Sequence, residues 1–297
     1  MKRIRIPGVI DLLISSDRSE IESLAQDPKL DRWYSDRSVP INSRILGQVL
    51  DALQIGGKRF PTVSAKDAPG RAEAQEALWT RLSAMAPAYS AGPDDLSDLA
   101  AFVRGDVPAD QVGLQVGLMV QRVVGRLFNP EFNATQESWN AAVVLDAAPR
   151  SVNPLHLAGL TSTKNDDDAK VLLAGMVAGD LAAVHAIGIA VHNLVSGVNL
   201  MQQLYADPSN RSALSPEAVS GRCVVAPATV LRQPTAPDSA GTEQFDIGTL
   251  VALKLQNANL QTRDADMAFM RKSWSRCPAE QWVPALLEGI WRRACQA

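Results

Sequence analysis

The stretch from Val171 to Ser209 constrains this chain more than any other. It is the longest apolar, helix-permissive segment of the 297 residues, and no proline interrupts it before Pro208. Its first half is crowded with small residues, among them Ala178, Gly179 and Ala182. A helix that is apolar on most sides is a buried helix, and small side chains let another helix or a flat ligand lie against its backbone. We therefore expect one long central helix over 171–209 that faces one or the other.

The rest of the chain also has the pattern of a mainly α fold with a minor β component. Apolar spacing, together with helix start and stop signals, predicts helices over 41–55, 70–86, 95–104, 109–128, 135–147, 215–224 and 278–294. We expect strands within 3–14 and over the alternating segment 245–259. Gly56–Gly57 should end the helix over 41–55. No internal repeat or long linker divides the sequence, which predicts a single domain over 1–297.

Charge and cysteine content narrow the class of protein. The net charge is −3 and no basic stripe is present, so we expect no nucleic-acid partner. Three irregularly spaced cysteines fit neither a disulfide framework nor a zinc site, which suggests a reducing cytoplasm. The start MKRIRIPGVIDLL lacks a cleavage site and does not resemble a signal peptide. Segment 171–195 is apolar enough for a membrane span, but Asp180 and two histidines within it argue against one.

Histidines on the central helix and aspartates before it are candidate binding groups. His185 and His192 are seven residues apart, about 10 Å along a helix, which is too far to share one metal ion. His185 could bind a ligand alone, or it could be a core histidine bonded to a carbonyl group. The three aspartates at 166–168 could attract Mg²⁺ or Ca²⁺, but we favour a role at the positive N-terminus of the helix. No nucleophile-elbow, P-loop or dinucleotide-binding motif is present.

Cys277 is the candidate nucleophile or metal ligand. It directly precedes Pro278, which marks the first turn of the last helix. A thiol at a helix N-terminus lies near unpaired N–H groups and the positive end of the dipole, and both favour the thiolate. Arg271, Lys272 and Arg276 add positive charge nearby. The local chemistry fits a thiolate that binds metal or attacks a substrate and, equally, an inert buried cysteine.

The order of these parts resembles the cytochrome P450 superfamily, and its soluble bacterial members most. The resemblance is carried by AGDLAAVHAIGIAVHNLVSGVNLMQQLYADPS (178–209), which looks like the family's central helix, FDIGTLVALKLQNAN (245–259), which looks like its IPxGTxVxLxxxxAN strand, and MAFMRKSWSRCPAEQW (267–282), which looks like its xAFGxGxHxCxG heme loop. LAQDPKLDR (24–32) and AKDAPGRAEAQEALWTRL (65–82) occupy the places of two early family segments. The resemblance implies a cytochrome P450-like helical fold with a long central helix, in which Cys277 would bind the iron of a heme.

Two of the family's catalytic motifs are absent. The acid–alcohol pair that delivers protons to bound oxygen falls on Leu181 and Ala182, neither of which carries a proton to deliver. The ExxR pair falls on Gly221 and Val224. These losses argue against ordinary monooxygenation with oxygen and electrons. They leave open peroxide-driven chemistry and the rearrangement of a substrate that brings its own O–O bond.

The residues that would hold the heme are also depleted. In the heme loop, Ser273 and Ala279 stand where glycines belong, and only Cys277 is kept. The family's propionate-binding His and Arg fall on Arg71 and Gln75. The arginines that could still pair with a propionate are Arg71, Arg222 and Arg232. Heme is therefore doubtful on sequence grounds, and Cys277 would be a metal ligand only if heme is retained.

Three hypotheses follow. The missing motifs favour a degenerate cytochrome P450-like protein without heme, which binds an apolar small molecule or acts as a partner subunit. Its pocket would be flanked by Ala178, Gly179, Ala182 and His185. The second hypothesis is a heme-thiolate enzyme, with Cys277 as axial ligand, that oxidises or rearranges an apolar molecule. The third is an all-helical interaction protein. In each we expect a cytoplasmic protein without a membrane span.

Overall fold

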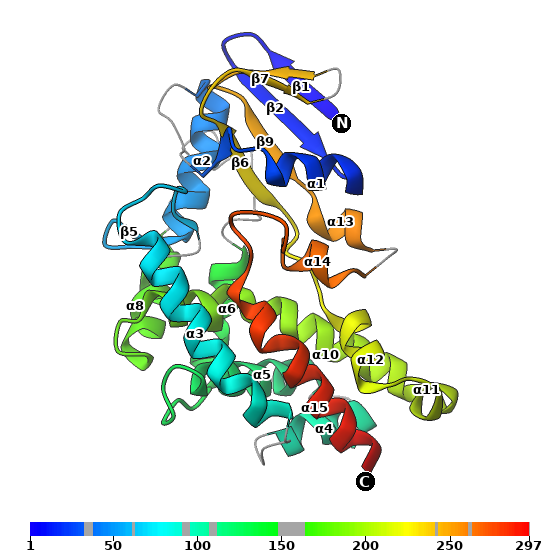
Figure 1. Ribbon diagram of the computed structural model, residues 1–297. Helices are drawn as coiled ribbons and strands as arrows, with labels where there is room; N and C mark the ends of the chain where they lie inside the picture. Colours follow the sequence, from blue (N-terminus) through cyan, green and yellow to red (C-terminus); the bar gives the residue numbers. More distant parts are fainter. Residues whose placement is uncertain are drawn as a thin grey trace.

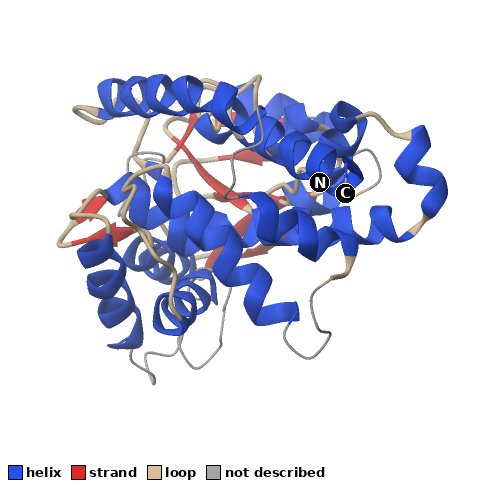
Figure 2. Cartoon of the chain, turned by 90° about the horizontal axis from the view of Figure 1, so that it is seen from below, coloured by secondary structure: helices blue, strands red, loops and turns tan. Residues whose placement is uncertain are grey.

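The computed structural model describes residues 1–32, 38–60, 63–90, 96–106, 112–147, 164–240, 243–260 and 263–296. Most strands gather at one end of the molecule, and the longer helices form a larger layer below them (Figure 1). Seen from below, helices cover most of the view and strands appear between them (Figure 2). The prediction of a mainly α fold with a minor β component is confirmed.

The described helices include most of those predicted, with shifted boundaries. They are α1 (Arg18–Gln26), α2 (Pro40–Ala52), α3 (Arg71–Ser90), α4 (Ser97–Arg104), α5 (Val112–Arg126), α6 (Gln136–Ala147), α8 (Lys164–Met176), α9 (Leu181–His185), α10 (Val191–Ala206), α11 (Pro208–Ala213), α12 (Pro216–Cys223), α13 (Leu255–Asn259), α14 (Ala265–Ala268) and α15 (Val283–Gln296). A π-helical turn, η3 (Ala186–Ala190), joins α9 to α10, and a 3₁₀ turn, η4 (Pro278–Gln281), precedes α15.

In the main sheet, strands from the start of the chain pair with strands from its last third. The strands are β1 (Lys2–Ile6), β2 (Ile10–Ser15), β3 (Leu30–Asp31), β4 (Gln54–Ile55), β5 (Lys58–Arg59), β6 (Val230–Pro234), β7 (Asp238–Ala240), β8 (Glu243–Phe245) and β9 (Leu250–Leu253). Five of them pair in the order β1-β2-β9-β6-β3, and only the β2–β9 pair is parallel. The antiparallel β3–β6 pair sets Asp31 opposite Gln233. The same register brings the next residues, Arg32 and Arg232, together.

Two predicted boundaries are wrong for local reasons. The strand expected over 245–259 covers only Leu250–Leu253 in β9, because its partner β2 ends at Ser15. Lys254 donates its N–H to the Ser15 carbonyl at 2.8 Å, and α13 begins directly after it. The helix expected over 41–55 ends at Ala52, and Gly56–Gly57, both with positive φ, form the turn of the β4–β5 hairpin instead.

The central helix is shorter than the predicted 171–209. Ala178 and Gly179 have φ of 52° and 76°, which is the left-handed region and breaks the helix between α8 and α9. Asp180 then starts a new helix, because its carboxylate accepts hydrogen bonds from two N–H groups of the first turn at 2.9 and 3.1 Å. The continuous helical run is therefore Leu181–Ala206, through α9, η3 and α10.

This run is long and apolar enough to cross a membrane by length and composition alone. Here α10 packs against α4, α5 and α12, and its residues Val191, Val198 and Met201 are buried in the core. Gly197 lets α12 approach closely, because a Cβ there would lie 2.4 Å from the carbonyl oxygen of Cys223. These contacts are those of a core helix.

The close approach of α10 and α12 predicts opposite effects for two glycine substitutions. Gly197→Ala should lower the free energy of unfolding by about 1–3 kcal/mol, because backbone must move to admit the methyl group. Gly47→Ala in α2, where a Cβ meets nothing within 4 Å, should raise it by up to about 1 kcal/mol. Urea unfolding of both variants checks this, and equal effects would contradict the described packing.

Candidate functional site

Cys277 lies in the loop between α14 and η4, which passes between the sheet and the helical layer (Figure 1). Its N–H donates to the Phe269 carbonyl at 2.8 Å, which closes the loop. Met270 begins the loop with a left-handed φ of 50°. The N–H of Ala279 donates a hydrogen bond to the Cys277 sulfur. A backbone amide aimed at the sulfur stabilises a thiolate or a metal-bound sulfur.

The Cys277 thiol can be reached by solvent, yet protein surrounds it. The side chain is exposed by surface area. Nevertheless, desolvation by the surrounding protein raises its pKa, and this outweighs the opposing effects of the Ala279 N–H and the positive charge of Arg32.

The expectation of a thiolate at the helix start, beside nearby cations, is confirmed only for one N–H group, that of Ala279, because desolvation raises the pKa of Cys277. The partners of these cations are Asp266 and Glu280 for Arg271, the Trp79 ring for Arg276, and Glu22 for Lys272. The expected helix N-terminus is η4, a 3₁₀ turn of four residues, which has little dipole. The charges are thus engaged elsewhere, and burial decides the pKa of Cys277.

His185 is the last residue of α9 in the central helix. Its side chain is half-buried, and its ring packs against Phe60 with centroids 5.4 Å apart. Desolvation lowers the pKa of His185 to about 4, and the charge of Arg32 adds to the shift. The imidazole is therefore neutral at physiological pH. The charge of Arg32 also acts on Cys277, where it opposes the desolvation that raises the pKa of the thiol.

Three buried guanidinium groups surround the ring of Trp274 in the Cys277 loop. Their central carbons lie 4.7 Å (Arg71), 5.2 Å (Arg232) and 5.9 Å (Arg32) from the ring centroid. The exposed fractions of these residues are 8%, 0% and 9%. Trp274 is held in place by its indole N–H, which donates to the Leu30 carbonyl at 3.3 Å. The face of an indole ring attracts cations, which offsets part of the cost of burying them.

Arg71, the first residue of α3, is poorly satisfied. Its Nε is buried without a hydrogen-bond partner. Burial and, next, repulsion from Arg32 lower the pKa of Arg71, and the carboxylate of Asp31 only partly opposes this. Moreover, Oδ1 of Asp31 already accepts the backbone N–H groups of Arg32 and Lys66, at 2.6 and 2.8 Å. A buried cation in this state would be stabilised by a bound anion.

The other predicted site residues are spread more widely. Ala178 and Gly179 are exposed in the turn before α9, and Ala182 is half-buried in α9. Arg222 is exposed near the end of α12, where its carbonyl accepts a hydrogen bond from Arg263. Of the predicted arginines, Arg71 and Arg232 lie on the ring of Trp274 in the Cys277 loop, whereas Arg222 lies in α12.

Arg32 and Trp274 are the members of this site that sequence reasoning missed, while Arg232 was only one of three candidates. Arg32 ends the segment LAQDPKLDR, but no spacing rule links it to a residue two hundred positions later. Only the β3–β6 register brings Arg32 and Arg232 together. Nothing in the local sequence marks Trp274 as the ring on which they gather.

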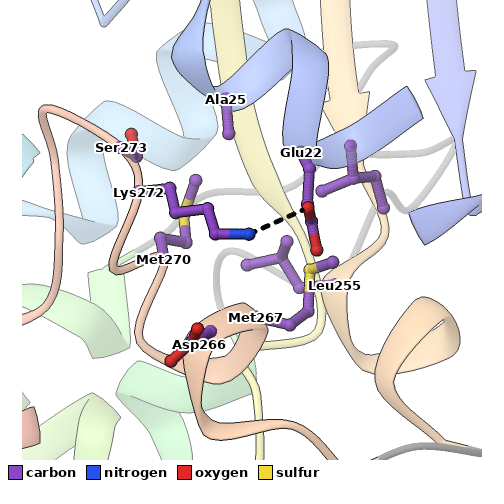
Figure 3. Close-up of a pocket in the computed structure, with 9 residues that line it drawn as sticks. Glu22, Ala25, Leu255, Asp266, Met267, Met270, Lys272 and Ser273 are labelled. Carbon is purple, nitrogen blue, oxygen red and sulfur yellow. Dashed lines mark hydrogen bonds and ion pairs between the residues drawn. The ribbon is translucent and has the colours of Figure 1, made fainter. Parts of the chain in front are cut away.

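A small cavity lies beside the Cys277 loop, between α1 and α14. Its lining residues are Ile21, Glu22, Ala25, Leu255, Asp266, Met267, Met270, Lys272 and Ser273. Its volume is about 20 Å³, which is room for about one water molecule. The Glu22–Lys272 ion pair, 3.4 Å long, spans it (Figure 3). It includes none of the residues predicted to flank an apolar substrate pocket, so that pocket stays a prediction.

The aspartates before the central helix show no sign of a metal centre. Asp166 and Asp167 lie in the first turn of α8, and Asp167 pairs with Lys170 at 3.4 Å. Within the described residues, no group of three or more His, Cys, Asp or Glu side chains is placed to hold a metal ion. The position of these aspartates agrees with a role at the helix N-terminus.

The lowered pKa of His185 predicts a loss of stability in acid. A base whose pKa is about 4 when folded and about 6.5 when unfolded favours folding above pH 6.5, and loses this contribution as the pH falls to 4. The contribution amounts to about 3 kcal/mol. His185→Gln should therefore flatten the fall in unfolding free energy between these pH values. Urea unfolding across this range checks it, and an unchanged slope would contradict the burial of His185.

The unsatisfied Arg71 predicts that ligand-free protein gains from its removal. Arg71→Met should raise the free energy of unfolding by about 1 kcal/mol, because a desolvated cation repelled by Arg32 is replaced by an apolar side chain of similar length. Lys29→Met, which breaks the solvent-exposed ion pair between Lys29 and Asp238, is the control and should leave it nearly unchanged. A clear loss of stability in Arg71→Met would show that the guanidinium is well satisfied.

Comparison with known proteins adds information about the fold. No family model and no curated protein matches the sequence. A cytochrome P450 of Mycobacterium smegmatis with econazole bound is 16% identical, with a TM-score of 0.63 over 99% of this chain and 85% of the other. A six-coordinate cytochrome P450 from Thermus thermophilus is 12% identical, with a TM-score of 0.59 over 96% and 84%.

A third similar structure is the cytochrome P450 BioI in complex with an acyl carrier protein that carries hexadec-9Z-enoic acid. It is 12% identical, with a TM-score of 0.58 over 100% of this chain and 86% of the other. Identities this low establish the fold alone. The resemblance expected from the sequence is confirmed at that level: the fold of this chain is that of the cytochrome P450s.

Proposed function

We propose that this chain is a heme-thiolate protein on a cytochrome P450 fold, acting on an apolar small molecule in the cytoplasm. The observation that carries the proposal is Arg71: a buried guanidinium with an unpartnered Nε, packed on Trp274 of the loop that presents Cys277. One ligand that offers both a metal for the thiol and carboxylates for the arginines would satisfy the two features together. Heme is such a ligand.

The residues present fit this group. Cys277 would bind the iron, and the Ala279 N–H would stabilise its sulfur as a thiolate. Arg71, with Arg32 and Arg232 on the same ring, would hold the propionate carboxylates. The pKa of Cys277 is raised, so binding the iron would release the thiol proton.

A bound heme-thiolate would supply oxidation chemistry that the side chains cannot. The chain would contribute a dry, apolar setting, in which Phe60 and the helix α9 border the space beside His185. The neutral imidazole of His185 can accept a proton, whereas Leu181 and Ala182 cannot deliver one. This balance favours a peroxide, or a substrate with its own O–O bond, over the ordinary use of oxygen.

The heme-free function favoured by the missing motifs remains the alternative. The observation that supports it is the break before α9, where Ala178 and Gly179 adopt left-handed φ and, among the described residues of this turn, no acidic side chain is left for proton delivery. Asp180, the carboxylate nearest to the absent acid–alcohol pair, is used as a helix cap and pairs with Arg81 at 3.0 Å. On this alternative, the scaffold would bind an apolar molecule or a protein partner without redox chemistry.

Heme reconstitution distinguishes the two functions. Purified chain titrated with hemin should give a Soret band that shifts to the position typical of thiolate-ligated heme when it is reduced under carbon monoxide. Cys277→Ala should lose this shift, while Cys295→Ala, which removes an exposed cysteine outside the site, should keep it. A folded protein that takes up no hemin would contradict the heme-thiolate proposal and support the heme-free alternative.

A further inference from the structure

The π-helical turn η3 interrupts the central helix directly after His185. Within it, the N–H of Val191 donates to the Ala186 carbonyl instead of the Ile187 carbonyl that an α-helix would use. The Ile187 carbonyl thereby loses its regular donor. This carbonyl lies in the core, where an unpaired polar group is costly.

Gln121 of α5 supplies the missing donor. Its side chain is fully buried, and its Nε2 donates to the Ile187 carbonyl at 3.1 Å. The same Nε2 donates to the Ser138 carbonyl at 3.0 Å, and the Gln121 Oε1 accepts the Ser138 hydroxyl at 2.7 Å. Because both ends of the amide are bonded, its orientation is fixed. The buried side chain of Gln121 thus hydrogen-bonds the carbonyl group that the π turn leaves without its regular backbone donor.

The turn determines where His185 points. A π turn holds one residue more than an α turn, and each residue of an α-helix turns the chain by about 100°. If this sequence formed an unbroken α-helix, α9 would rotate by about that angle relative to α10. His185 would then leave its packing against Phe60.

We propose that Gln121 is a positioning residue: it holds the π turn through the Ile187 carbonyl, and the π turn keeps the His185 imidazole packed against Phe60. The inference requires no heme, so it can fail or succeed independently of the proposed function.

Nuclear magnetic resonance of the ligand-free chain, labelled with ¹⁵N-histidine, tests this. The sequence has three histidines, so His185→Gln identifies the His185 signal. In the native chain, this signal should titrate near pH 4. In Gln121→Met, which keeps the side-chain length but removes the donor, the pKa should rise by more than about one unit towards its ordinary value, and the ring-current shift from Phe60 should be lost.

Gln202→Met is the matched control. Gln202 also donates from a side-chain amide to a backbone carbonyl, that of Phe102, at 2.9 Å, but it lies in α10 beyond the π turn. This variant should leave the His185 signal unchanged. An unchanged pKa and chemical shift of His185 in Gln121→Met would overturn the proposal.

Deletion of Ala190 gives a second test that does not depend on Gln121→Met being folded. Removing one residue from η3 should restore a regular α-helix without rotating α9, so the His185 pKa should stay near 4. In this background, Gln121→Met should no longer shift the pKa. If the double variant does not fold, or if its His185 signal moves as in Gln121→Met alone, Gln121 acts on the core and not through the turn.

Discussion

The candidate site depends on one aromatic ring that holds three like charges. The indole of Trp274 carries the guanidinium groups of Arg71, Arg232 and Arg32 within 4.7–5.9 Å of its centre. Cation–π attraction of about 0.5–2 kcal/mol per contact offsets only part of the desolvation of three buried cations, and Arg32 repels Arg71. Arg232 also donates to the Leu231 carbonyl and to the Ser275 hydroxyl, so Arg71, with its unpartnered Nε, is the member that a bound anion would stabilise most. The buried charge of Arg71 is therefore the feature of the fold that supports an anionic ligand.

The fold imposes the cluster through elements far apart in the sequence. Pairing of β3 with β6 fixes Arg32 and Arg232, the start of α3 contributes Arg71, and the Cys277 loop inserts Trp274 between them. The π turn of the central helix and the buried Gln121 give His185, which packs on Phe60, a defined direction.

Periodicity and turn chemistry predict most of the helices but not the site. The apolar spacing of α5 predicts that helix because its packing face is continuous in sequence. The start of α6 is predicted by Thr135, whose hydroxyl accepts the Ser138 N–H at 3.1 Å. The central helix is overestimated, because Ala178 gives no sign of a left-handed backbone and Asp180 caps a helix inside an apolar run. Cys277 is recognisable from its motif. Arg32 and Trp274 are not, because their roles arise from strand register and loop packing, which local patterns do not contain.

The central claim is that the arginine cluster beside Cys277 is built for the carboxylates of a heme. The most direct test compares the thermal unfolding midpoint of the ligand-free chain with hemin, with iron-free protoporphyrin and with the dimethyl ester of hemin. A ligand that binds only the folded state raises the midpoint. We predict that hemin raises it most, that iron-free protoporphyrin also raises it, and that the ester raises it far less. An ester that stabilises the protein as much as hemin, or no stabilisation by any of the three, would contradict the claim.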